Sequence, residues 1–147
     1  LSLSNHMVEI GGEVRVSGYN NTREWSLGLL NPLNGNIFKV VNLSDKSLAT
    51  SGTYNNFFVY NEREYSHLIN PVTGYPIKHN AKSVSVISNN CIDADALATL
   101  IITYENPYDA IKVINKIENV EALILVLDDD NQIIEVKTKG YDKYYAN

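Results

Sequence analysis

An aspartate and a threonine one helical turn apart are the residues best suited to chemistry. Asp95 and Thr99 fall within residues 93–102, a pattern that predicts a helix with Asp93 as its N-cap. Residues four apart lie on one helix face. A carboxylate and a hydroxyl there are hard oxygen ligands that suit Mg²⁺ beside water and substrate phosphates. The alternative is a capping aspartate with a buried threonine that bonds back to its own helix.

A second candidate is the loop of residues 66–76, Ser-His-Leu-Ile-Asn-Pro-Val-Thr-Gly-Tyr-Pro. Its two prolines fix φ and its glycine allows positive φ, so the backbone is tightly prescribed. It places His67 at the end of a predicted strand, where an imidazole can face a ligand. The alternative is an ordinary turn whose histidine caps or packs.

The elements around these two candidates are mostly strands. Apolar and β-branched runs predict strands at residues 7–10, 14–16, 25–30, 36–43, 57–60, 64–69, 83–88, 122–127 and 132–136. Residues 47–56 fit either a strand that passes close to another group or a polar loop. Gly11 and Gly12 fit either a turn or a place where a ligand touches the main chain.

A second helix is predicted after the first, capped by Asn106 with Pro107 in its first turn. Its predicted apolar face consists of Tyr108, Ile111, Val113, Ile114 and Ile117. The sequence thus predicts one α+β domain over residues 1–147, a largely antiparallel sheet with two helices between late strands, and a weakly ordered tail at residues 141–147.

Composition and missing motifs exclude several classes of function. The net charge of −5 and the absence of a basic run argue against nucleic-acid binding. The single cysteine, Cys91, allows no internal disulfide. The spacing of His6, His67 and His79 does not suit a zinc site. The Walker phosphate loop, the dinucleotide fingerprint and the Gly-x-Ser-x-Gly motif do not occur.

Four segments together resemble the C-terminal part of the ApbE family, the FAD:protein FMN transferases. They occur in the family's order, and their matching positions are Val-Glu-Ile-Gly-Gly-Glu at 8–13, Leu-Ala-Thr-Ser-Gly-x-Tyr-x-Asn at 48–56, Tyr-Ser-His-x-Ile-x-Pro-x-Thr-Gly-x-Pro at 65–76 and Ala-Asp-Ala-Leu-Ala-Thr at 94–99. The resemblance implies an ApbE-like, T-fold-like domain. It also implies Mg²⁺ as cofactor, FAD as substrate, and transfer of FMN to a threonine or serine hydroxyl of an acceptor protein.

The resemblance also implies roles for individual residues. Asp95 and Thr99 resemble the family's metal ligands, and Ala98 stands at a position that is acidic in some members. His67 resembles the histidine near the flavin phosphates, a candidate base or orienting group. The flavin-contacting positions implied are Gly11, Gly12, Glu13, Leu68 and Thr73.

Two other activities are compatible with the same residues. One is a Mg²⁺-dependent FAD pyrophosphatase that yields FMN and AMP, and the other is a flavin-binding domain without catalysis. The family's N-terminal half does not precede these residues. We therefore expect a C-terminal fragment of a longer protein, with little or no transferase activity by itself. The resemblance places the whole protein in the bacterial cell envelope, held at the membrane only by an N-terminal lipid anchor outside this chain.

Overall fold

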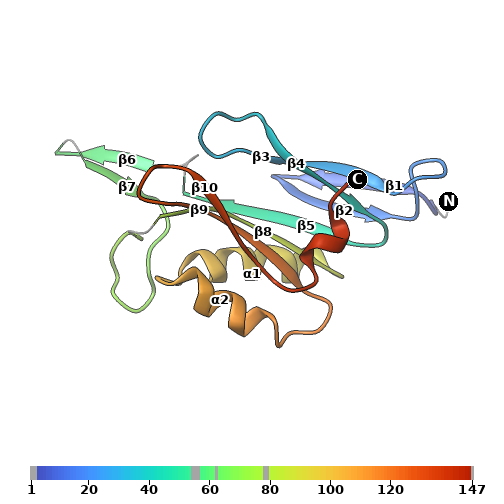
Figure 1. Ribbon diagram of the computed structural model, residues 1–147. Coiled ribbons are helices and arrows are strands. Elements are labelled where there is room, and N and C mark those ends of the chain that lie inside the picture. Colours follow the sequence, from blue (N-terminus) through green and yellow to red (C-terminus); the bar gives the residue numbers. More distant parts are fainter. Residues whose placement is uncertain (1–2, 54–56, 62, 78–79, 147) are drawn as a thin grey trace.

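The computed structural model describes residues 3–53, 57–61, 63–77 and 80–146, which form a largely antiparallel sheet and two α-helices (Figure 1). Tyr54, Asn56 and His79 lie outside the described residues. Six strands make the main sheet in the order β1-β2-β5-β8-β9-β10, with every neighbouring pair antiparallel. Their bounds are β1 His6–Ile10, β2 Glu13–Ser17, β5 Ser47–Gly52, β8 Ala81–Ser88, β9 Glu121–Leu127 and β10 Ile133–Lys137. The predicted α+β class is confirmed.

Two further hairpins lie outside the main sheet. β3 (Trp25–Leu30) pairs with β4 (Ile37–Leu43), and β6 (Phe57–Tyr60) pairs with β7 (Arg63–Ser66). Figure 1 shows the β6–β7 hairpin extending away from one end of the sheet. Of the alternatives for residues 47–56, the strand is correct for residues 47–52, because they form β5 between β2 and β8 inside the sheet.

The two faces of the sheet are covered by different elements. Helices α1 (Cys91–Ile102) and α2 (Pro107–Ile114) cover one face, as Figure 1 shows. The β3–β4 hairpin and a 3₁₀ helix, η1 (Tyr141–Tyr144), cover the other face. Alternate residues of β5 and β8 contribute to the two cores, because successive side chains of a strand point to opposite faces.

The helix ends follow local capping chemistry, with one correction. The side chain of Asn106 accepts a hydrogen bond from Tyr108 N, and Pro107 opens α2, as predicted. Helix α1, however, begins at Cys91 after an extended Asn90, so Asp93 is a first-turn residue and not the N-cap. The side-chain amide of Asn90 donates to the Asp93 carboxylate (3.1 Å), which therefore faces its own helix start.

The apolar face predicted for the second helix is only partly correct. Ala110, Ile111 and Ile114 are its buried residues. Tyr108, Val113 and Ile117 are exposed, because α2 ends at Ile114 and a single face of so short a helix contacts the core.

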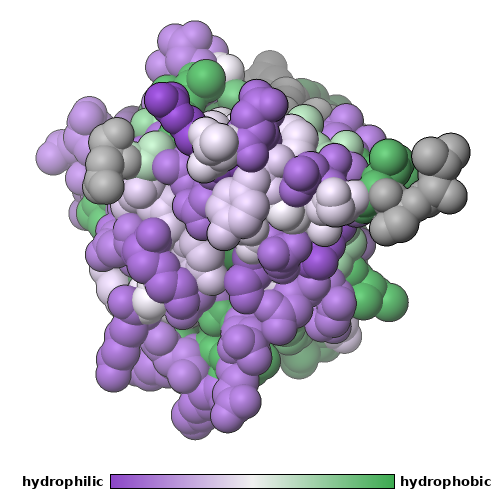
Figure 2. Space-filling model, turned by 90° about the vertical axis from the view of Figure 1, so that its right-hand side faces the viewer, coloured by the Kyte–Doolittle hydropathy of each residue, from purple (hydrophilic) through white to green (hydrophobic). Residues whose placement is uncertain are grey.

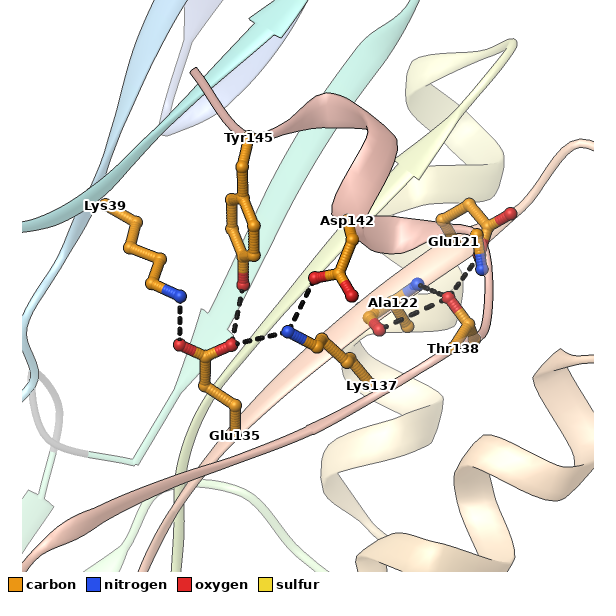
Figure 3. Close-up of polar contacts among 9 residues, drawn as sticks. Lys39, Glu121, Ala122, Glu135, Lys137, Thr138, Asp142 and Tyr145 are labelled. Carbon is orange, nitrogen blue, oxygen red and sulfur yellow. Dashed lines mark hydrogen bonds and ion pairs between the residues drawn. The ribbon is translucent and has the colours of Figure 1, made fainter. Parts of the chain in front are cut away.

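The weakly ordered tail predicted for residues 141–147 is wrong over the described residues, up to 146. Tyr141 is fully buried against the core on the β3–β4 side of the sheet. Tyr145 donates from its hydroxyl to Glu135, and Lys137 bridges Glu135 and Asp142, as Figure 3 shows. The tail could not be predicted because contacts with β4 and β10, which lie far from it or outside any local pattern in sequence, hold it in place.

The end of the molecule that lies opposite to the β6–β7 hairpin is largely hydrophilic. Figure 2 looks onto this end of the molecule, where hydrophobic residues occur only in smaller groups. Within the described part of the chain, no helix has the length and apolar character needed to cross a membrane.

Candidate functional site

Helix α1 packs closely on the sheet through small side chains. Ala94 and Ala98 are fully buried, and they share a core cluster with Ala49 of β5. These alanines therefore bring the helix near the strand, while Ala96 faces solvent. The structure contradicts a side-chain metal-ligand role for Ala98, because its methyl group carries no oxygen and points into the core.

The start of α1 is fixed to the sheet by basic side chains. The Arg15 guanidinium on β2 donates to the main-chain carbonyl of Asn89 (2.6 Å) and to that of Asp45 (3.2 Å). The Lys46 ammonium donates to the Asn89 side chain (2.5 Å). These contacts tie the segment before α1 to β2 and to the turn before β5, so the helix has a defined position over the sheet.

An exposed side of α1, next to β5, carries the two residues predicted to be oxygen ligands. Asp95 and Thr99 are both exposed. The Thr99 hydroxyl lies 3.1 Å from the hydroxyl of Ser51 on β5. Thr99 is therefore not the buried threonine of the alternative interpretation, and its recorded partner lies on a neighbouring strand instead of its own helix.

This oxygen pair fits a hard cation by its chemistry. In the part of the chain that the structure describes, no ion pair engages the Asp95 carboxylate, so its oxygens are available. Mg²⁺ binds in proteins through one or two carboxylates together with waters and phosphates, and Asp95 with Thr99 meets that need. Over residues 3–53, 57–61, 63–77 and 80–146, no group of three His, Cys, Asp or Glu side chains could hold a metal ion.

The glycine pair forms a two-residue hairpin turn between β1 and β2. Ile10 pairs with Glu13, and the φ angles of Gly11 and Gly12 are +68° and +104°. The turn interpretation is thus confirmed. A Cβ on Gly12 would meet nothing within 4 Å, so the turn also leaves open space beside its main chain.

The turn lies at the same end of β5 as Ser51. Val14 pairs with Leu48 in antiparallel register, so residues before Val14 lie beside the part of β5 that follows Leu48. Strand alternation places Glu13 on the helix-bearing face, because Val14 packs into the opposite core. The structure thus brings Glu13 and the Ser51–Thr99 pair to one end and one face of the sheet.

The loop after β7 is held by its own hydrogen bonds. The Asn70 side-chain oxygen accepts from Val72 N (2.8 Å) and Thr73 N (3.2 Å), and Gly74 adopts a φ of +72°. Ile77 N donates to the Leu68 carbonyl (3.0 Å). The backbone of the loop is therefore constrained, as its prolines and glycine predict.

The loop contacts the far end of α1. Two cavities of about 290 and 390 Å³ share four lining residues: Asn70, Thr73, Thr103 and Glu105. Tyr65 and Tyr75 also line the first cavity. Val72, Leu100 and Tyr104 also line the second cavity. Thr73 therefore lines a ligand-sized hollow beside the helix.

The candidate residues of the loop differ in their exposure and lie away from Asp95. His67 is exposed at the end of β7, and Leu68 is partly buried against the helix-side core. Thr103, which faces the loop, follows Asp95 by eight residues, or about 12 Å along a helix axis at 1.5 Å per residue. The loop and Asp95 thus lie at two ends of one helix, with Thr99 between them.

Sequence reasoning missed three residues of this region. Thr103 continues the four-residue spacing of Asp95 and Thr99, and this spacing was a signal that could have found it. Ser51 was part of a small hydroxyl-rich segment without an assigned role. Glu105 follows α1 and has no sequence signal, because its place in both cavities depends on how the loop folds back.

These features define an α+β domain whose helix-bearing face carries the exposed Asp95 and Thr99 on α1, with the loop of residues 66–76 at the far end of that helix. Residues 1–124 match the model of the ApbE family. The chain belongs to the ApbE family.

Named relatives agree with this assignment. The chain is 36% identical over 132 residues to the FAD:protein FMN transferase of Vibrio cholerae, a match that covers 87% of the chain and 39% of that protein. It is 32% identical over 148 residues to the protein of that name from Haemophilus influenzae, with 97% and 42% covered. The chain thus spans about two fifths of the length of these relatives.

Solved structures show the same fold. The crystal structure of the ApbE protein from Thermotoga maritima superposes with a TM-score of 0.81 at 26% identity, covering 97% of this chain and 45% of that chain. The flavin transferase ApbE from Vibrio cholerae superposes with a TM-score of 0.78 at 31% identity, covering 96% and 44%.

Proposed function

We propose that this chain forms part of an enzyme that transfers FMN from FAD to a threonine or serine hydroxyl of an acceptor protein. The relatives named FAD:protein FMN transferase support the reaction class. The observation in the structure that supports it best is the exposed Asp95–Thr99 pair, whose hard oxygens suit a cation bound to a pyrophosphate.

In this proposal Asp95 and Thr99 hold Mg²⁺, which when bound neutralises charge on the FAD pyrophosphate. Two side chains leave the remaining coordination positions to phosphate oxygens, water or groups outside the described residues. Glu13 and the Gly11–Gly12 turn, which leaves open space at Gly12, lie at the same end of the sheet. They are suited to approach the bound nucleotide from the β2 side.

His67 is proposed to take the proton of the acceptor hydroxyl. The hydroxyl oxygen forms a bond to the FMN phosphorus, the phosphorus–oxygen bond to AMP breaks, and AMP leaves. A hydroxyl is a poor nucleophile at neutral pH, so a positioned imidazole is useful to it. Leu68 and Thr73 are proposed to contact the flavin nucleotide, and the Thr73 cavities are large enough to take part of such a ligand.

The test uses the intact protein that carries residues 1–147, incubated with FAD, Mg²⁺ and a candidate acceptor. In-gel flavin fluorescence on the acceptor indicates transfer, whereas free FMN and AMP indicate the pyrophosphatase. If FAD is unchanged, flavin binding without catalysis is the alternative that remains. His67→Ala and Asp95→Asn are each expected to abolish most of the transfer, and His6→Ala on the edge strand serves as the matched histidine control. A His67→Ala protein that flavinylates its acceptor at the normal rate removes the role assigned to His67.

We further propose that residues 1–147 alone have little or no transferase activity, since they span about two fifths of the named relatives. Robust FAD turnover by this piece would contradict that. The cell-envelope location and the N-terminal lipid anchor are proposals that rest on the family resemblance alone. Fractionation of cells that produce the intact protein tests them.

A further inference from the structure

We propose that Ser51 is a positioning residue for the metal site, acting through Thr99. This inference rests on the proposed function, since it assumes that Thr99 binds the cation. Its basis is the 3.1 Å contact between the two hydroxyl oxygens, which join β5 to α1 across 48 positions of sequence.

The chemistry of a threonine ligand favours such a partner. A hydroxyl has one proton and two acceptor lone pairs. When a lone pair of Thr99 faces a cation, its proton needs an acceptor elsewhere, and the Ser51 oxygen is within reach. Partners of this kind fix the orientation of metal ligands in many sites.

The helix itself offers the Thr99 hydroxyl a competing hydrogen-bond acceptor. Threonine in a helix divides between two χ1 rotamers, because its hydroxyl can also bond to the carbonyl three or four residues earlier. For Thr99 the carbonyl four residues earlier is that of Asp95, the second proposed ligand. Ser51 favours the rotamer that reaches the strand, so the hydroxyl stays in one place before the cation arrives.

Ser51 is itself well fixed. It pairs with Val84 of β8 in the antiparallel ladder between β5 and β8. The buried alanines Ala94 and Ala98 bring α1 close enough for the two hydroxyls to meet. A partner held by the sheet makes the position of Thr99 depend on the strand as well as on the helix.

The experiment measures Mn²⁺ binding by the intact protein, from the electron paramagnetic resonance signal of the free ion during titration. Ser51→Ala is expected to weaken Mn²⁺ binding by roughly 10- to 100-fold, the usual effect of losing such a partner. The melting temperature should stay close to that of the wild type. Ser85→Ala is the matched control, because Ser85 makes a similar hydroxyl contact with Thr50 (2.8 Å) on the opposite face of the sheet. It should leave Mn²⁺ binding unchanged.

A double-mutant cycle tests whether Ser51 acts through Thr99. In a Thr99→Val background, Ser51→Ala should cause no further loss, since the hydroxyl that it orients is gone. An additive loss would overturn the positioning role.

Two other outcomes separate this inference from the proposed function. If Asp95→Asn weakens Mn²⁺ binding and Ser51→Ala does not, the inference fails and the metal site stands. If Asp95→Asn and Thr99→Val both bind Mn²⁺ as the wild type does, the metal site and the inference fail together.

Discussion

Replacing Glu135 by glutamine should loosen the C-terminal segment, because this carboxylate joins it to two strands. One oxygen of Glu135 lies 2.5 Å from Lys39 Nζ on β4, and the other accepts from Lys137 Nζ and the Tyr145 hydroxyl, each at 2.9 Å. Figure 3 shows these three donors converging on the carboxylate. Glutamine keeps the shape of the side chain but removes its charge and turns one acceptor into a donor that faces a cation.

The expected loss follows from the burial of the cluster. Hydrogen bonds to charged groups contribute about 1.5–3 kcal/mol each, and water screening reduces that value where the partners are exposed. The Glu135 side chain is 17% exposed and that of Lys39 is 37% exposed. We therefore expect Glu135→Gln to lower the free energy of unfolding by about 2–3 kcal/mol, or the melting temperature by about 4–12 °C for a domain of this size.

The loss should also depend on pH. Burial alone would raise the pKa of Glu135, but the hydrogen bonds from Lys39, Lys137 and Tyr145 outweigh it and lower the pKa below its ordinary value of 4.5. A carboxylate with a lowered pKa in the folded state stabilises the fold above its unfolded pKa. That stabilisation is lost as the pH falls through the folded pKa. The difference between wild type and Glu135→Gln should therefore be full at pH 7 and shrink below pH 4.5.

Thermal unfolding followed by circular dichroism from pH 7 down to pH 3 provides the measurement. Glu118→Gln is the matched control, since Glu118 is exposed and the described residues form no ion pair with it. It should change stability by less than about 0.5 kcal/mol. Equal stability of wild type and Glu135→Gln at pH 7 would refute the reasoning, and so would a difference that does not shrink in acid.

Two further substitutions test the backbone and the packing of the site. Gly12→Ala should destabilise by about 1–3 kcal/mol in urea unfolding, because a φ of +104° strains any residue with a Cβ; an unchanged midpoint would show that the turn adapts. Ala98→Leu should cost about 1–3 kcal/mol by overpacking the helix against the sheet, whereas exposed Ala96→Leu should leave the melting temperature nearly unchanged. Equal effects of the two leucines would contradict the packing described for α1.

Local chemistry was predictable from the sequence wherever neighbours in the chain decide it. The Asn106 cap depends on a hydrogen bond two residues away, and the glycine turn depends on two φ angles. The Asp95–Thr99 pair lies on one helix face because the spacing requires it. These features need only residues a few positions apart.

Features that join distant segments were not predictable in this way. The hydroxyl contact of Ser51 depends on how β5 lies under α1. Burial of Tyr141 depends on a core built from strands far earlier in the chain. The helix start at Cys91 was missed for a different reason, since an extended Asn90 without a side-chain capping bond leaves no clear signal.

The contact between Ser51 and Thr99 also has a consequence for how the protein folds. It closes a loop of 48 residues, and the contact of Arg15 with Asn89 closes one of 74. Contacts between residues far apart in sequence form slowly, because the chain must lose much entropy before they stabilise it. The face that carries the proposed cation site should thus form late in folding, after β5 has paired with β8. Under that proposal, Mn²⁺ binding during refolding would report completion of the sheet.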